Sequence, residues 1–220
     1  MAKLAKDTSY NLLDEVCIEG REIFLHPSVE IDHDVAGRFV RRVRALESMS
    51  DSPIIFHLCS GGGSWHDGMA IYDCIKHSSC SFIVLCYGIA ASMGSLIPQA
   101  AWPKGKRISM PNCDWMIHEG YLELSGSHRQ VISSATWDNK SKNFMYNVYT
   151  DVCESTGGYF EGKTRNQIKS YLKRKLDSKE DWWMSSDDAL LYGFVDNIIG
   201  NEDVENVDKI VKNVSRVLQL

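Results

Sequence analysis

Two segments rich in small residues have the composition needed to place a reactive group beside backbone amides. The first, SGGGS at residues 60–64, follows the apolar run 54–58 and precedes a helical pattern. Glycines there let the chain turn sharply and bring its amide hydrogens close to a ligand. The nucleotide-binding patterns G-x-x-x-x-G-K-[ST] and G-x-G-x-x-G are absent. An oxyanion-binding loop and a plain strand–helix turn both remain compatible with this segment.

The second segment, YGIAASMGS at residues 87–95, ends an apolar run and places Ser92 at the expected start of a helix. An exposed nucleophile on a sharp strand-to-helix turn requires such small neighbours. The amide of Met93 would then face an anion, because the first amides of a helix lack partners within it. Position 90 is alanine, so the strict G-x-S-x-G pattern is absent. Taken alone, Ser92 is equally compatible with a helix N-cap.

A serine nucleophile needs a base, and His118 is the best placed of the seven histidines. It ends the apolar segment DWMI and is followed closely by Gly120, which favours a position at the edge of a sheet. A lone histidine is also compatible with a simple surface or hydrogen-bonded role. The others are His26, His33, His57, His66, His77 and His128.

The acid that would orient the histidine is less sharply defined by the residues. Asp181 precedes Trp182, Trp183 and Met184, an apolar run that could bury and orient a carboxylate. Three other acids in the same region stay open as alternatives: Asp177, Asp187 and Asp196.

Strand and helix patterns alternate through the first two-thirds of the chain and predict an α/β fold with parallel strand pairing. The last third opens with a long polar helix pattern. The expected strands are residues 21–25 (ending at His26-Pro27), 53–58, 81–87, 106–110, 114–118 and 194–199. The expected helices are residues 34–49, 65–76, 92–101, 129–154, 165–175 and 185–192.

Composition excludes several classes of protein. A chain of 220 residues that is 44% hydrophobic and 10% aromatic is not disordered, and its net charge of −5 argues against general nucleic-acid binding. No stretch reaches the roughly 18 apolar residues of a membrane helix, and the first residues lack a secretory signal. The seven scattered cysteines form no C-x-x-C pair, so we expect buried thiols, no metal site and a cytoplasmic location.

Several segments together resemble the proteolytic subunit of the Clp protease, ClpP. They are SGGGS…DGMAIYDCIK, YGIAASMGSLIPQAA…GKRISMPN…WMIHEG and EDWWMSSDDALLYGFVDNI. The resemblance runs from about Tyr10 to about Ile199, and its segments are specific through their common order and spacing.

The resemblance implies a role for each candidate residue. Ser92 matches the family nucleophile, His118 its general base and Asp181 the acid that orients the histidine. The amides of Gly63 and Met93 match the oxyanion hole. The chain order Ser…His…Asp differs from the orders of α/β-hydrolases, chymotrypsin and subtilisin, which argues against those three folds.

The fold implied is the ClpP/crotonase-like βαβ spiral in one domain over residues 1–220, with a protruding handle at about 120–160. The function implied is a serine endopeptidase that cleaves unfolded polypeptides or short peptides inside stacked seven-membered rings. It would use no metal or cofactor of its own. A separate AAA+ ATPase would feed the chamber, since this chain has no Walker A motif.

The resemblance also implies an apolar cleft that receives loops of the partner. The matching positions are equally compatible with ordinary core packing, and His57 stands where the family usually has an aromatic residue. These positions are Ile55, Leu85, Tyr87, Ile108 and Met110.

Four departures from the family pattern suggest a divergent member. The stretch between the histidine and the aspartate is long, with extra residues near 165–179, and the handle segment 120–126 lacks adjacent glycines. Lys179-Glu180 reverses the usual charge order before the aspartate, and few residues precede Tyr10. Two other functions therefore stay open: a silent subunit of a mixed ring, and a crotonase-like enzyme acting on acyl-CoA thioesters.

Overall fold

The computed structural model describes residues 10–11, 16–25 and 30–217, whose strands join into one nine-stranded sheet. The main path of the sheet runs β1-β2-β3-β4-β5-β6-β9, while β7 pairs with β5 and β8. The strands are β1 (Tyr10–Asn11), β2 (Val16–Cys17), β3 (Glu22–Leu25), β4 (Ile54–Ser60), β5 (Phe82–Ala91), β6 (Lys106–Ser109), β7 (Asp114–Ile117), β8 (Trp182–Met184) and β9 (Asn197–Ile198).

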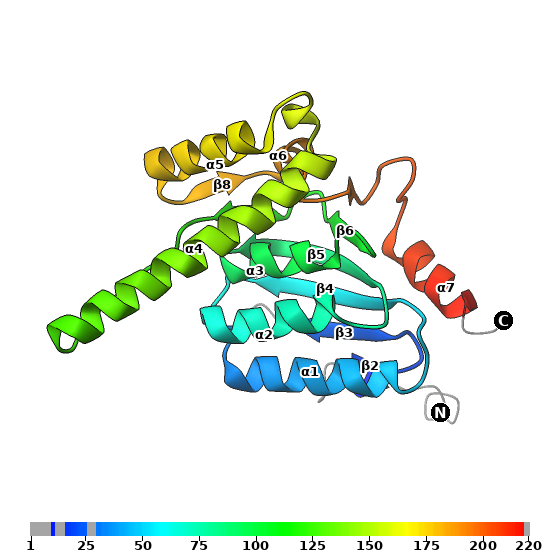
Figure 1. Ribbon diagram of the computed structural model, residues 1–220. Coiled ribbons are helices and arrows are strands. Elements are labelled where there is room, and N and C mark those ends of the chain that lie inside the picture. Colours follow the sequence, from blue (N-terminus) through cyan, green and yellow to red (C-terminus); the bar gives the residue numbers. More distant parts are fainter. Residues whose placement is uncertain (1–9, 12–15, 26–29, 218–220) are drawn as a thin grey trace.

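Helices pack around this sheet, with α1 and α2 side by side along it and α4 extending away as a long arm (Figure 1). The helices are α1 (His33–Glu47), α2 (Trp65–Lys76), α3 (Met93–Leu96), α4 (His128–Thr156), α5 (Arg165–Lys179), α6 (Ser186–Tyr192) and α7 (Val207–Val217), with two 3-10 turns, η1 (Ile97–Ala101) and η2 (Gly158–Phe160).

Strand β5 organises the sheet because it pairs with a different neighbour along each half of one edge. Its first half pairs in parallel with β6, from Ile83 opposite Lys106 onward, and its last residues pair in parallel with β7, up to Ala91 opposite Met116. Its other edge pairs with β4. Three parallel strands therefore end close together at the carboxyl end of β5.

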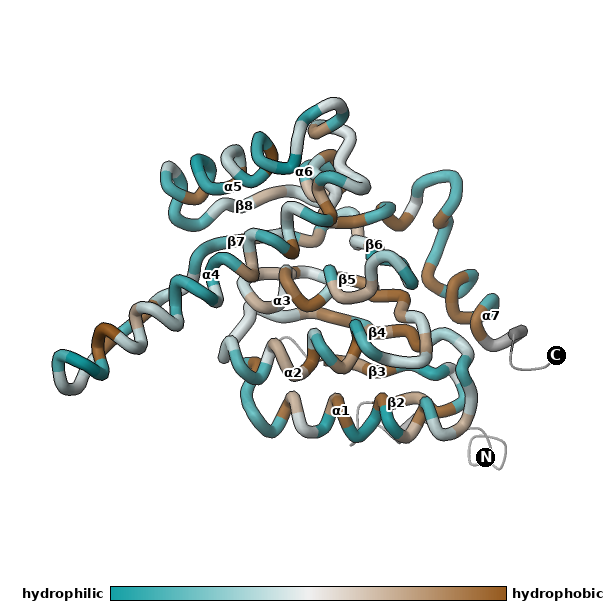
Figure 2. Tube along the Cα trace, in the orientation of Figure 1, coloured by the Kyte–Doolittle hydropathy of each residue, from teal (hydrophilic) through white to brown (hydrophobic). Residues whose placement is uncertain are grey.

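Apolar periodicity explains why the first helices pack on the sheet. In α1, Val35, Phe39, Val43 and Leu46 recur at helical spacing and are all buried, and the side chain of Asp32 caps the first turn. Figure 2 shows the same pattern as brown strands and helix faces turned inward, with teal residues outside.

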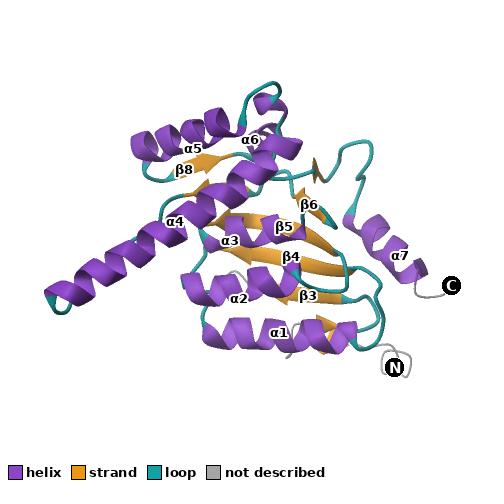
Figure 3. Cartoon of the chain, in the orientation of Figure 1, coloured by secondary structure: helices purple, strands orange, loops and turns teal. Residues whose placement is uncertain are grey.

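Helix α4 is the long polar helix that the sequence pattern predicts, and only its second half is packed into the core. Ser127 and Gln130 form a capping box at its start, while its buried residues begin at Met145. Residues 118–127, which lead into it, form no strand in the structure and run as a loop beside α4 (Figure 3).

The structure confirms the α/β fold and most of the expected elements, with several differences. The expected helix 92–101 divides into α3 and η1, since Pro98 lacks the amide that a continuous helix would need. Strand β5 continues to Ala91, and the last expected strand shortens to β9. Strands β1, β2 and β8 and helix α7 were not predicted, and His26-Pro27 lies outside the described residues.

The cysteines carry free thiols, and five are buried while Cys59 and Cys74 are half-buried. Burial raises the pKa of the Cys113 thiol to about 12, so this group stays protonated at neutral pH. Across residues 10–11, 16–25 and 30–217, no helix combines the length and apolar character needed to cross a bilayer.

Candidate active site

Ser92 sits on a strained turn between β5 and α3. Its backbone has φ 54° and ψ −125°, a conformation that residues with a side chain rarely adopt. Its amide donates a hydrogen bond to the carbonyl of Met116 at 2.9 Å, which ties the turn to the end of β7. This hydrogen bond helps to hold the strained serine at the carboxyl ends of the parallel strands.

The glycine loop at residues 60–64 packs directly against this serine. A Cβ at Gly62, where φ is +106°, would lie 2.6 Å from the Cβ of Ser92, so only glycine fits there. The amide of Ile31 donates to the carbonyl of Gly62 at 2.9 Å, and the amide of Ser64 donates to the carbonyl of Ile31 at 2.8 Å. Backbone contacts thus fix the loop on both sides of Gly63.

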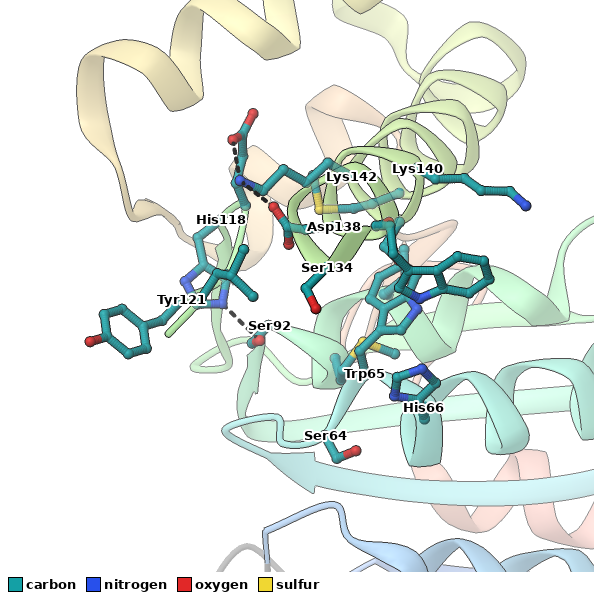
Figure 4. Close-up of a pocket in the computed structure, with 18 of the residues that line it drawn as sticks. Ser64, Trp65, His66, Ser92, His118, Tyr121, Ser134, Asp138, Lys140 and Lys142 are labelled. Atoms are coloured by element: carbon teal, nitrogen blue, oxygen red, sulfur yellow. Dashed lines mark hydrogen bonds and ion pairs between the residues drawn. The ribbon is translucent and has the colours of Figure 1, made fainter. Parts of the chain in front are cut away.

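The structure brings the three side chains selected from the sequence into one chain of contacts. The Nε2 atom of His118 lies 2.8 Å from the Oγ atom of Ser92 (Figure 4). The Nδ1 atom of His118 lies 3.2 Å from Oδ1 of Asp181. An imidazole held between a hydroxyl and a carboxylate can accept the hydroxyl proton and have its other nitrogen oriented by the acid.

Pairing between β7 and β8 explains how Asp181 reaches the histidine. The two strands are antiparallel, and Ile117 pairs with Trp182. Extending the register by one residue places His118 opposite Asp181. Strand β8 is therefore essential to the site, and its only signal in the sequence is the short run of two tryptophans and a methionine.

The alternative acids lie elsewhere. Asp196 makes a 2.5 Å ion pair with the buried Arg107, which binds it to the end of the sheet away from Ser92. Asp187 is in the first turn of α6, where a negative charge favours the helix. Asp177 is exposed on α5. The Asp181 side chain is 52% exposed.

A cleft of about 1200 Å³ opens beside Ser92 and His118. Its walls come from α2, α3 and α4, which places segments distant in sequence around one space. The close-up shows Trp65, His66 and Ser134 around this space together with Ser92 (Figure 4). Gly63 lies on its edge, and the large side chains that line it include Trp65, Met93, Leu96, Tyr121, Trp137, Met145 and Tyr149.

Metal-binding chemistry has no visible site in the part of the chain that the structure describes. No group of three or more histidine, cysteine, aspartate or glutamate residues there is arranged to hold an ion.

The five positions matched to the partner cleft lie away from this site, and helix α7 covers most of them. Ile55, Leu85 and Ile108 are buried in a small apolar cluster with Val214 of α7, separate from the main core. Tyr87 is half-buried at the edge of the same cluster. Met110 packs instead against the main core. Their role in docking remains a prediction.

His57 belongs to a buried polar group beside that cluster. Its Nε2 lies 2.9 Å from Oε2 of Glu22, and its Nδ1 lies 2.9 Å from the Tyr87 hydroxyl. Its ring stacks on Phe24 with centroids 4.3 Å apart. Burial raises the pKa of Tyr87 to about 12, so the phenol stays neutral beside the imidazole.

Comparison with known proteins yields one family. Residues 5–202 match the Clp protease family. The chain is 30% identical over 184 residues to the ATP-dependent Clp protease proteolytic subunit 3 of Synechococcus sp. (strain CC9902), covering 83% of this chain and 84% of that protein. It is 32% identical over 193 residues to the ATP-dependent Clp protease proteolytic subunit 2 of Mycolicibacterium paratuberculosis (strain ATCC BAA-968 / K-10). That match covers 86% of this chain and 88% of that protein. The strained serine, the glycine loop and this similarity along nearly the whole chain agree, and the protein belongs to the Clp protease family.

Proposed function

We propose that this protein is a serine endopeptidase that hydrolyses polypeptides through Ser92, His118 and Asp181. The observation that carries the proposal is the continuous contact from the Ser92 hydroxyl through the His118 ring to the Asp181 carboxylate, at 2.8 and 3.2 Å. A silent subunit would need none of these three groups in contact with one another.

In the proposed mechanism, Nε2 of His118 takes the hydroxyl proton of Ser92 as the oxygen attacks a peptide carbonyl. The tetrahedral intermediate then collapses, and His118 gives the proton to the departing amine. Water repeats the sequence on the acyl-serine and releases the acid. Asp181 holds Nδ1 in its protonated form and stabilises the imidazolium formed in both steps.

The amides of Gly63 and Met93 would bind the oxyanion. Both residues border the cleft that contains Ser92, and Met93 provides the first amide of α3. Amides fixed by the surrounding backbone stabilise the developing charge without reorganising during the reaction. The apolar wall of the cleft suits a large apolar side chain beside the scissile bond.

The same proposal includes the assembly expected of the family. The subunits would form stacked seven-membered rings in the cytoplasm, and a separate AAA+ ATPase would deliver unfolded chains to the enclosed sites. The chemistry would depend on side chains and amides of this chain, with no added cofactor. An enclosed chamber would protect other proteins from a reactive serine.

A fluorophosphonate probe tests the catalytic part of the proposal. We expect covalent labelling of Ser92 in the assembled protein, found by peptide mass spectrometry, and hydrolysis of fluorogenic peptides. Ser92→Ala should abolish labelling and reduce turnover by about 10⁶-fold. Native mass spectrometry of the same samples should give a multiple of seven subunits.

An assembled wild-type protein that neither labels nor hydrolyses peptides would overturn the peptidase assignment in favour of a silent subunit. Turnover of acyl-CoA thioesters that survives Ser92→Ala would favour the crotonase-like alternative.

A further inference from the structure

The chain leaves regular structure at His118, one residue beyond the end of β7. Its preceding residue, Ile117, is paired on β8, while residues 118–127 form a loop. Within that loop Tyr121 is 88% exposed. Unpaired backbone is free to move unless side chains restrain it, so the contacts of the first loop residues matter for the position of the imidazole.

Glu119 is attached to helix α4 by two side chains. The Tyr146 hydroxyl donates a hydrogen bond to Oε1 of Glu119 at 2.6 Å, and Nζ of Lys142 lies 3.3 Å from Oε2. Lys142 is itself held 3.0 Å from Oδ2 of Asp138, as the dashed lines in Figure 4 show. Both carboxylate oxygens of Glu119 are therefore engaged from one helix.

The anchor on the α4 side is firm. Tyr146 is only 2% exposed, and it lies in the part of α4 that packs into the core. Burial, reinforced by the hydrogen bond to Glu119, raises the pKa of Tyr146, so its proton stays available for donation. Burial opposes the charge of Lys142, but hydrogen bonds to Asp138 and Glu119 raise its pKa and keep it cationic. Hydrogen bonds to an ionised carboxylate are stronger than neutral ones.

The contacts of Glu119 matter because the His118 ring must hold two contacts at once. His118 must keep Nε2 within reach of Ser92 and Nδ1 within reach of Asp181 at the same time. Pairing with β8 restrains the chain before the histidine, and Glu119 restrains it directly after. A misplacement of about 1 Å in such a site costs roughly 100-fold in rate.

We propose that Glu119 is a positioning residue, which holds His118 between Ser92 and Asp181 by fastening the first loop residue to Tyr146 and Lys142 of α4. This inference rests on the proposed peptidase function for its effect on rate. Its effect on the mobility of the loop is independent of that function.

Three variants test the anchor in the full-length assembled protein. Glu119→Ala should lower kcat by about 10- to 100-fold and leave KM within twofold, because alignment is lost while the cleft is kept. Glu119→Gln retains an acceptor for the Tyr146 hydroxyl and should recover part of the loss. Tyr146→Phe should lower kcat about 10-fold, and combining it with Glu119→Ala should add little, since both remove the same contact.

Asp151→Asn is the matched control. Asp151 is also on α4 and is paired with Arg165 of α5, away from the cleft, so its loss should leave kcat unchanged. Amide exchange of residues 119–126, followed by mass spectrometry, should accelerate in Glu119→Ala and Tyr146→Phe and stay constant in the control.

Two results would overturn the inference. A higher KM at constant kcat in Glu119→Ala would assign Glu119 to substrate binding, because the residue also borders the cleft. Unchanged amide exchange in Glu119→Ala and Tyr146→Phe would show that the loop is held by other contacts. This second readout separates the inference from the peptidase assignment, because it applies even if wild-type protein fails to label at Ser92.

Discussion

Ser92 and Asp181 are held in place by very different means, although both contact the same imidazole. Around the serine, Ser60, Ala90, Ala91 and Met93 are all buried, and Gly62 and Gly63 leave no space for an added methyl group. The aspartate follows Glu180, which ends α5 with φ 59°, and its own side chain is half-exposed. Ser92 is fixed by backbone packing, and Asp181 by strand register and one neighbouring side chain.

That neighbour is Trp182, which binds β8 to an aromatic cluster. Its ring lies 5.0 Å from Tyr192 and 6.2 Å from Tyr171, centroid to centroid, and the residue is 6% exposed. The cluster includes Tyr171 of α5, in the stretch 165–179 where the resemblance to the family predicts extra residues. The comparison teaches that the parallel-sheet half fixes Ser92 rigidly, while β8 and α5 position Asp181 through side-chain packing.

The largest effect that we predict within this comparison comes from Asp181→Asn. The amide cannot stabilise an imidazolium or select the correct ring tautomer, so kcat should fall by about 10⁴-fold. Peptide hydrolysis at saturating substrate measures it. Asp187→Asn, an exposed acid six residues away, is the control and should leave kcat unchanged. Equal losses in both variants would mean that Asp181 has no special role.

The next largest loss of kcat is expected when a single methyl group is added beside Ser92. In Gly62→Ala the new Cβ would lie 2.6 Å from that of Ser92, and alanine also disfavours φ +106°. If the methyl group displaces the serine by up to about 1 Å, kcat should fall by about 100-fold. Fluorophosphonate labelling rates give an independent measure of serine reactivity.

The control for this change is Gly158→Ala in the other half. A Cβ there meets nothing within 4 Å, so kcat and thermal stability should stay unchanged. If Gly62→Ala retained full activity, the claim that backbone packing fixes the nucleophile would be wrong.

Much of the fold was predictable because its signals are local. Helix α2 has the predicted bounds, since its apolar spacing and its cap at Ser64 act within a few residues. Strand β8 was missed because three residues carry too little pattern, and its existence depends on pairing with β7 far away in the chain. Helix α7 lies beyond the stretch that the resemblance covers, and its place over Ile55 and Leu85 follows from tertiary packing.

The residues of the candidate site likewise divide into those that local patterns predict and those that only tertiary contacts select. Small residues in short segments indicate Ser92 and the glycine loop. The position of His118 after an apolar strand indicates the histidine. Asp181 could not be separated from its rivals by local pattern, because the register of two distant strands selects it. The cleft wall from α4, including Trp137 and Met145, depends on how that helix crosses α3, which no periodicity encodes.

The smallest effect should come from weakening the aromatic cluster that holds the acid. Trp182→Phe keeps a ring but loses volume in a buried site, which should lower the free energy of unfolding by about 1–2 kcal/mol. The end of β8 would then be less well held, and kcat should fall less than about 10-fold because the register with β7 remains. Trp183→Phe is the matched control, since Trp183 is 53% exposed on the opposite face of the same strand. Chemical denaturation measures the free energy of unfolding, and peptide turnover measures kcat, in both variants. An equal loss of kcat in the two variants would argue that strand register alone, without the cluster, positions Asp181.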